Sequence, residues 1–543
     1  MSNSFMNKLS FKNKIFINAF NSFLFLICLV LGLWNFPIAL TQPNMAYMPG
    51  DMGDSRFINF ILEHGYQFII GNEPSFYNAP FFYPTKNTLA FSDNMVGTLP
   101  IYTLFRSLSF DRETAYQYWW ISLFIINYIV AFYCFNKITN NNYAAILGAY
   151  LFAFSMIMFG QCNYTQLNIR FMLPVIIMAA YNLAVRPNVK HYYLLVLAIG
   201  FQFVLGIYYA FLSIYLLVIF FTCFAIINWN INFIKQLFIS KKQSAKTVLF
   251  TLITIGLLVI YMQNYIAISN KVGLHQFHEV LKLVPTFTSY FLANDASIWA
   301  FTNSYGKHLL EDRWWLNEFF MGAFPIILLL LNIIYTIKNK RQNIFLLFAI
   351  AIAIVCSLLF ANKYSVLSMF YYLPGFGSLS VLVRVITVIF TLIVFVNVLY
   401  LNTLFLKFQT WKLPLFIVLF TILYIDNYAN ANSLLRTKKE TITSRYKTIE
   451  KQLANNKKTI LAIVNEEEDL KNYKMHIDAI LCAQTHNMKT VNGYSSNSPE
   501  NYYDFSVKHN RKTLNDWCNY NNFDTNIVII IDNINPITTV NNE

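Results

Sequence analysis

The chain has 543 residues, of which 56% are hydrophobic and only 12% are charged. These proportions exclude an ordinary soluble globular protein and predict helices that are solvated by a lipid bilayer. The formal net charge is +14, which in a soluble protein would favour nucleic-acid binding. In a membrane protein the net charge has meaning only through the side of the bilayer on which each basic residue lies.

Eleven apolar segments have about the length of a membrane span, since a spanning helix needs roughly 20 mainly apolar residues. Lys8, Lys12 and Lys14 precede the first segment, as in a signal peptide. That segment is long and has no small-residue cleavage site, so we expect it to remain as a membrane helix. The run 191–228 is too long for one helix, and its only interruption is Gly206-Ile-Tyr-Tyr. The segments are 15–38, 114–136, 143–159, 169–185, 191–206, 209–228, 247–266, 318–337, 343–361, 378–400 and 413–428.

The charges of the connecting segments predict an orientation. If the N-terminus lies inside the cell, the inner segments contain Lys and Arg but no Asp or Glu, and all 26 acids lie outside or near the outer boundary. Basic residues in short inner loops set the orientation of membrane proteins. We therefore expect an integral protein of the cytoplasmic (inner) membrane with a cytoplasmic N-terminus, and nucleic acid is not an expected partner. The inner segments are 1–14, 137–142, 186–190, 229–246, 338–342 and 402–412.

Three long regions fall on the outer side in this orientation: 41–113, 267–317 and 429–543. The first, here called loop 1, is too polar to span and too aromatic for a loose linker, so we expect short amphipathic helices along the membrane surface. The chain therefore divides into an α-helical polytopic membrane module, 1–428, and an extracytoplasmic tail.

The tail has the pattern of a small α/β domain. Polar helical stretches lie near 441–455 and 508–518, and the apolar runs TILAIV and NIVIIID predict strands. Cys482 and Cys518 could form a disulfide in an exported tail, although the sequence does not show whether they meet. The acidic run 466–469 is more typical of a solvated turn or helix start than of a metal site.

The sequence Pro49-Gly-Asp-Met-Gly-Asp-Ser-Arg in loop 1 is the sharpest chemical feature. It places Asp51 and Asp54 three residues apart, just beyond the first apolar segment, with Arg56 adjacent. A pair of carboxylates half-buried against the membrane face could hold one of them as a general base. The alternative is that Asp54 caps the helix SRFINFILEHG, since Asp is a favoured N-cap residue. The two roles can coexist.

Other polar residues of the outer regions are weaker candidates. His64 has no second His at metal-ligand spacing and is more typical of a buried interface. Asp93 is either a site residue or a cap for the helix MVGTLPIYTLFRSL. Lys282 and Glu318 match no metal motif. The chain has no G-x-x-x-x-G-K-[ST] sequence, which argues against a nucleotide-driven pump.

Arg384 lies a few residues inside the apolar run PGFGSLSVLVRVITVIF. A cation there is costly unless it is paired or faces a cavity, which makes it a candidate functional residue. Phosphate would be a suitable partner, because a guanidinium binds it through two hydrogen bonds and keeps its proton. Extension of the side chain to the outer headgroups explains the same position equally well.

Several stretches carry a resemblance to a known superfamily. Loop 1 contains GDMGDSRF, then LEHG, then FFYPTKNTLAFSDNMVGTLPIYTLFR. NYTQLN lies at the outer end of the third segment, LPGFGSLSVLVR precedes a late segment, and VNGYSSNSP lies in the tail. These stretches resemble the GT-C superfamily of membrane glycosyltransferases, which includes protein mannosyltransferases, oligosaccharyltransferases and aminoarabinose transferases. The similarity is one of loops and topology and extends over most of the chain.

The resemblance implies an outward-facing site between loop 1 and the membrane core, a polyprenyl-phosphate sugar donor, a glycan or lipid acceptor, and a loop-1 acid as the base. That acid would be Asp54 or Asp51; Asp54 is preferred because it lies at the start of the amphipathic segment, with Asp51 as its supporting partner. Arg384, with Arg56 or Lys282, would stabilise the departing lipid phosphate. Some members of the superfamily require a divalent metal and others do not, and no cluster of ligands here decides between them.

Two other classes of protein fit part of the pattern. A transporter or flippase of lipid-linked saccharides would also use aromatic residues, many helices and an intramembrane cation, but inverted repeats and paired broken helices are expected there and neither is evident. A non-catalytic assembly factor of glycan biosynthesis in the cell envelope would use the tail as a binding module. The identity of the sugar and of the acceptor is not encoded in any motif that we recognise.

Overall fold

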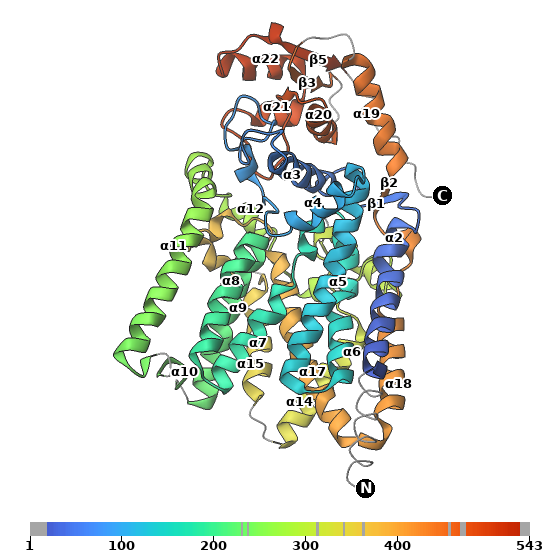
Figure 1. The fold of residues 1–543 in the computed structure, drawn as a ribbon, viewed down its shortest axis with the longest axis vertical. Helices are drawn as coiled ribbons and strands as arrows, with labels where there is room; N and C mark the ends of the chain where they lie inside the picture. Colours follow the sequence, from blue (N-terminus) through green and yellow to red (C-terminus); the bar gives the residue numbers. More distant parts are fainter. Residues whose placement is uncertain are drawn as a thin grey trace, which may run out of the picture.

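The computed structural model shows a mostly helical protein with a few short strands. A bundle of long helices lies below a smaller group of helices and strands formed by loop 1 and the tail (Figure 1). The predicted basic N-terminus and residues 467–469 of the acidic run lie outside the described residues. The structure describes residues 19–229, 232–235, 238–310, 314–339, 343–360, 364–453, 458–466 and 474–532.

Seven helices among the described residues are long and apolar enough to cross a membrane. This finding supports a helical membrane protein. The seven are Ala19–Thr41, which ends in α2 (Ala39–Thr41); α5 (Arg112–Thr139); Asn142–Gln161, which begins with α6 (Asn142–Ala153); α9 (Ile207–Asn228); α11 (Lys241–Val272); Leu382–Lys407, which contains α17 (Val385–Lys407); and Gln409–Asp426, which contains α18 (Lys412–Asp426).

Four shorter apolar helices fall at the remaining predicted segments: α7 (Met172–Val185), α8 (Val189–Leu205), α14 (Ala323–Asn339) and α15 (Ile344–Ser357). Each predicted segment therefore coincides with a helix, while the number that cross the membrane stays a prediction. The break expected at Gly206 is confirmed, because α8 ends at Leu205 and α9 begins at Ile207. A glycine favours such a break because it lacks a side chain and destabilises a helix interior.

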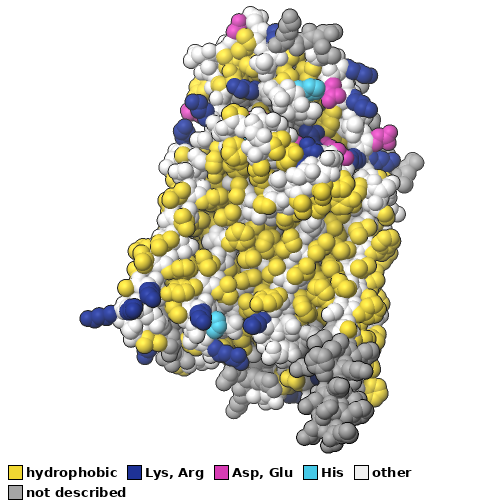
Figure 2. Space-filling model, in the orientation of Figure 1, with side chains coloured by type: hydrophobic (Ala, Val, Ile, Leu, Met, Phe, Trp, Pro, Cys, Tyr) yellow, Lys and Arg dark blue, Asp and Glu magenta, His cyan; other side chains and the backbone are white. Residues whose placement is uncertain are grey.

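Helix α17 lies at the centre of the bundle. It is apolar on all sides and packs against α5, α6, α7, α9, α14 and α15. A helix that is hydrophobic all round is stable only when other helices surround it. The outer faces of the bundle are also apolar, and Figure 2 shows them as a broad hydrophobic band between two ends that carry charged side chains. Helix α11 exposes most of its length, including Leu252, Leu257 and Ile260.

Loop 1 forms two of the helices expected from its sequence, α3 (Asp54–Ile69) and α4 (Leu99–Ser107). Helix α3 lies across the end of the bundle and packs against α4, α5 and α20 (Lys474–Thr485) of the tail (Figure 1). Its residues from Ser55 to Gly65 are buried, so α3 separates the bundle from the tail. Short helices occupy the second outer region and the remaining connections: α10 (Asn232–Lys235), α12 (Phe277–Leu281), α13 (Phe301–Leu310) and α16 (Val366–Met369).

The tail contains a three-stranded parallel sheet in the order β4-β3-β5. Its strands are β3 (Ile460–Val464), β4 (Lys489–Thr490) and β5 (Val528–Asp532), so both predicted strands are confirmed. The predicted polar helices are confirmed as α19 (Lys439–Leu453) and α22 (Arg511–Tyr520). Two further helices complete the tail, α20 (Lys474–Thr485) and α21 (Tyr503–Lys508). Cys482 and Cys518 are both buried and not joined by a disulfide.

Several contacts join the tail to loop 1, and two of them flank Asp54 in sequence. Strand β1 (Tyr47–Pro49) pairs antiparallel with β2 (Arg436–Lys438), which follows the last apolar helix. Farther along, the buried Asp478 of α20 accepts hydrogen bonds from Arg56 of α3, at 2.7 Å, and from Arg445 of α19. This charged cluster fixes the tail to the element that begins at Asp54.

Candidate functional site

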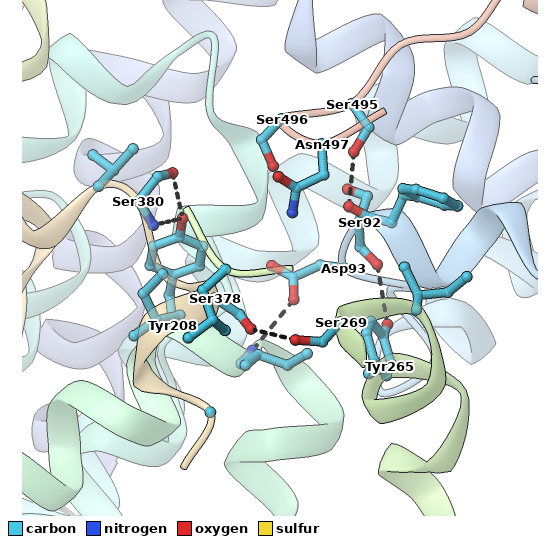
Figure 3. A pocket seen from close by; sticks show the side chains of 18 of the residues that line it. Ser92, Asp93, Tyr208, Tyr265, Ser269, Ser378, Ser380, Ser495, Ser496 and Asn497 are labelled. Atoms are coloured by element: carbon cyan, nitrogen blue, oxygen red, sulfur yellow. Dashed lines mark hydrogen bonds between the residues drawn. The ribbon is translucent and has the colours of Figure 1, made fainter. Parts of the chain in front are cut away.

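A cavity of about 880 Å³ lies where loop 1, the tail and the end of the bundle meet. We call it the loop-1 cavity. Polar side chains point into it from several elements, as Figure 3 shows. Its walls are formed by the start of α3, residues 90–93, the start of α9, the last turns of α11, residues 371–381 with Arg384, and residues 494–497 of the tail.

Asp54 is the first residue of α3 and lines the loop-1 cavity. Gly53 occupies the N-cap position, so the interpretation of Asp54 as the helix cap is wrong. The Asp54 carboxylate instead accepts a hydrogen bond from the Tyr494 hydroxyl of the tail. Burial raises the pKa of Asp54, while the Tyr494 hydrogen bond and the charge of Arg384 lower it. Such opposing effects suit a group that exchanges a proton.

Arg384 lines the same cavity from the turn before α17 and is 8% exposed. Its guanidinium lies 4.3 Å from the ring centre of Tyr208 and 5.7 Å from that of Tyr164. No ion pair joins Arg384 to a carboxylate within the part of the chain that the structure describes. Cation–π contacts leave the N–H groups at the edge of the guanidinium able to bind an anion.

Asp93 is the second carboxylate of the loop-1 cavity. It does not cap α4, which begins at Leu99; its Oδ1 accepts a hydrogen bond from the backbone N–H of Ile207, at 3.4 Å. Burial raises the pKa of Asp93, and the charge of Arg384 lowers it. Asp54, Asp93 and Arg384 therefore share one cavity and one electrostatic environment, although they come from three separate parts of the chain.

Asp51 and Arg56 have different surroundings. The Asp51 carboxylate accepts a hydrogen bond from the backbone N–H of Gly53 at 2.7 Å, and one of its oxygens lies 3.3 Å from the Lys474 ammonium nitrogen. Arg56 is buried against Asp478, and Tyr446 accepts a further hydrogen bond from it at 3.1 Å. Neither Asp51 nor Arg56 lines the loop-1 cavity. Both hold the turn before α3 and thereby the position of Asp54.

The remaining sequence candidates lie elsewhere. His64 is buried with its Nε2 atom 2.9 Å from the Phe76 carbonyl oxygen, and burial lowers its pKa. Glu318 is buried and accepts a hydrogen bond from Asn294 at 2.6 Å. Lys282 is exposed and pairs with Glu279 at 2.7 Å. The structure does not bring these three side chains to the loop-1 cavity.

Several cavity residues were not among the sequence candidates. Tyr494 and the polar residues after it lie in VNGYSSNSP, a stretch noted for its resemblance, while Tyr164 lies in NYTQLN. Tyr208 directly follows the break at Gly206. Each stretch interrupts a regular apolar or helical pattern, but nothing local in the sequence shows that they meet.

The loop-1 cavity thus combines two half-buried carboxylic acids, a cation that forms no ion pair among the described residues, and a polar wall. Among the described residues, no group of three or more His, Cys, Asp or Glu side chains could hold a metal ion. The two cavity carboxylates are the only acidic ligands that its lining supplies within that part of the chain.

Comparison with known proteins gives no guide to this arrangement. No protein-family model matches the chain, and no curated protein matches it significantly. The function must therefore be inferred from the side chains that line the cavity.

Proposed function

We propose that this protein is a membrane glycosyltransferase of the GT-C type, which moves a sugar from polyprenyl phosphate to an extracytoplasmic acceptor. The observation that supports it best is the presence, in one cavity, of the half-buried acid Asp54 and of Arg384, a cation that pairs with no carboxylate among the described residues. An acid whose pKa is raised suits a general base, and a guanidinium suits a phosphate.

In the proposed reaction Asp54 accepts the proton of an acceptor hydroxyl. The acceptor oxygen forms a bond to the anomeric carbon of the donor sugar, and the bond from that carbon to the phosphate oxygen breaks. The phosphate oxygen keeps the electron pair, and the polyprenyl phosphate leaves. Arg384 stabilises the negative charge that develops there, an electrostatic contribution that usually dominates in such sites.

The wall formed by α11 suits a lipid-linked donor. Met262, Ile266 and Leu274 line the loop-1 cavity at the end of this helix, and Ile266 is also exposed on the surface. Apolar side chains thus continue from the cavity towards the exposed face of α11. A prenyl chain could lie against these side chains while its phosphate reaches Arg384.

A membrane orientation completes the proposal. Eleven spans would place the N-terminus in the cytoplasm and loop 1 with the α/β tail outside. On the face shown in Figure 2, Asp and Glu are visible only near the end that carries the tail, while the opposite end shows Lys and Arg. This distribution supports the orientation expected from the positive-inside rule.

Binding of a farnesyl phosphate probe to the full-length protein in nanodiscs tests the donor site. Arg384→Gln should weaken binding at least tenfold, because hydrogen bonds to charged groups contribute about 1.5–3 kcal/mol. Lys282→Gln is the matched control, since this exposed cation lies outside the cavity lining. Equal affinities of the two variants would contradict the role of Arg384.

The proposed role of Asp54 as the base is tested by measuring sugar transfer. Membranes of source cells that lack the gene supply unmodified acceptor, and mass spectrometry of their glycans measures transfer. Asp54→Asn should abolish transfer, whereas Asp51→Asn should leave part of it. If both variants and their combination transfer normally, Asp54 is not the base. Movement of lipid-linked glycan across the membrane without transfer would instead support a flippase.

A further inference from the structure

The loop-1 cavity has two walls of different chemistry. On one side α11 contributes mostly apolar residues such as Met262 and Ile266, although its Ser269 and Asn270 also line the cavity. On the other side the tail contributes residues 494–497, and Ser92 of loop 1 lies beside Ser495 in Figure 3. The apolar wall suits the lipid of the proposed donor, so the polar wall needs a separate explanation.

The polar wall is firmly attached to loop 1. The backbone N–H of Phe82 donates to the Asn492 carbonyl oxygen at 3.2 Å, and the Ser495 hydroxyl donates to the Phe91 carbonyl oxygen at 2.7 Å. Gly493 packs so closely on the Phe82 ring that a Cβ atom would lie 1.9 Å from it. This segment is therefore held in one position, as a binding wall requires.

The groups that this wall presents are available for a ligand. Within the described part of the chain, no hydrogen bond occupies the Ser496 hydroxyl or the Asn497 amide, and both side chains point from the tail into the cavity (Figure 3). Asp93 adds a carboxylate whose only hydrogen bond among those residues is the one from Ile207. A hydroxyl, an amide and a carboxylate together offer both donors and acceptors.

We propose that Ser496, Asn497 and Asp93 form the acceptor subsite and bind a hydroxyl-rich saccharide. This inference rests on the proposed function and names the acceptor class for the same site. Sugar hydroxyls both donate and accept hydrogen bonds, which matches the groups of the wall. The wall also ends at Tyr494, which hydrogen-bonds Asp54. An acceptor bound along residues 495–497 therefore presents a hydroxyl near the base.

The donor phosphate belongs to a different part of the cavity. Arg384 stacks on Tyr208, and Figure 3 shows Tyr208 across the cavity from Ser495. The Tyr208 hydroxyl is itself hydrogen-bonded to Ser380, at 3.1 Å, which fixes the ring. A phosphate at Arg384 thus lies across the cavity from residues 495–497, while Asp93 lies within reach of the charge of Arg384.

Transfer by the full-length protein in nanodiscs tests the subsite. Transfer is measured against increasing amounts of acceptor membranes, and affinity for farnesyl phosphate is measured in parallel. Replacing Ser496 and Asn497 together by Ala should raise the apparent KM for acceptor membranes at least tenfold and change the farnesyl phosphate affinity less than twofold. The matched control replaces the partly exposed Ser506 and the exposed Asn519, two tail residues outside the cavity lining, by Ala.

Chemical treatment of the acceptor membranes tests the saccharide class. Periodate cleaves vicinal diols, so treated and quenched membranes should lose their acceptance, whereas protease-treated membranes should keep it. The subsite is overturned if the double variant has the KM of its control, if farnesyl phosphate affinity falls equally, or if acceptance survives periodate. Normal transfer by Asp54→Asn would instead contradict the proposed function, so the two failures can be distinguished.

Discussion

Replacement of Asp478 by Asn should loosen the packing of the tail on α3. Asp478 is fully buried and accepts hydrogen bonds from Arg56 at 2.7 Å and from Arg445 at 2.9 Å. Asn has nearly the same shape but no charge, so the substitution leaves two buried guanidinium groups without a counterion. Breaking a buried ion pair in this way costs about 3–5 kcal/mol.

Hydrogen exchange, measured by mass spectrometry on the protein in nanodiscs, shows which elements lose stability in this variant. Since about 1.4 kcal/mol corresponds to a tenfold change, amides of α20 and β3 should exchange at least about 100-fold faster. Amides of α5 and α17 in the bundle should keep their protection, because Asp478 contacts neither helix through its carboxylate. Transfer should also fall, because Tyr494 is placed against Asp54 by the same tail.

Asp516→Asn is the matched control for this substitution. Asp516 lies on the exposed face of α22, so its loss should change exchange in the tail very little. The reasoning is refuted if Asp478→Asn exchanges like Asp516→Asn. It is equally refuted if exchange rises uniformly through tail and bundle, since the ion-pair cluster would then not be what joins the two.

Three other substitutions test the surroundings of the site. Tyr494→Phe removes a hydrogen bond that lowers the pKa of Asp54, so the acid limb of the pH–rate profile for transfer should move to higher pH while the alkaline limb stays. Burial and the neighbouring His509 hold the pKa of His476 well below its ordinary 6.5. The unfolded tail therefore binds more protons below that value, and protection factors of β3 should fall from about pH 7 to about pH 5, a dependence that His476→Gln should flatten. Gly493→Ala should reduce transfer at least tenfold by displacing Phe82, whereas Gly256→Ala on α11, where nothing lies within 4 Å, should be tolerated.

The elements that the sequence predicts well are those whose signal is local. An apolar run of about 20 residues indicates a helix in the bundle, and the strands β3 and β5 follow from short apolar runs bounded by polar residues. The break at Gly206 is equally local. Each of these patterns reports the environment of its own residues and needs no knowledge of distant ones.

The contacts that build the site are long-range, and no local pattern contains them. Tyr494 and Asp54 are 440 residues apart, and Arg56 and Asp478 are 422 apart. The sequence of loop 1 indicates a candidate site because its acidic residues and glycines directly follow an apolar segment. The tail that completes its cavity has ordinary composition, so its role depends on how β3, β4 and α20 place residues 494–497 above α3.

The two candidate arginines show why the fold is needed to choose among charged residues. Arg56 and Arg384 both lie close to predicted membrane segments in the sequence, and the sequence allows either to bind a phosphate. Burial removes water from both guanidinium groups, so the ability of each to bind an anion depends on the charges near it. Arg56 has its charge neutralised by the buried Asp478, whereas Arg384 is held between aromatic rings and faces a cavity. An anion that enters this cavity meets a cation that forms no direct ion pair among the described residues, although Asp54 and Asp93 share its electrostatic environment, and this difference selects Arg384.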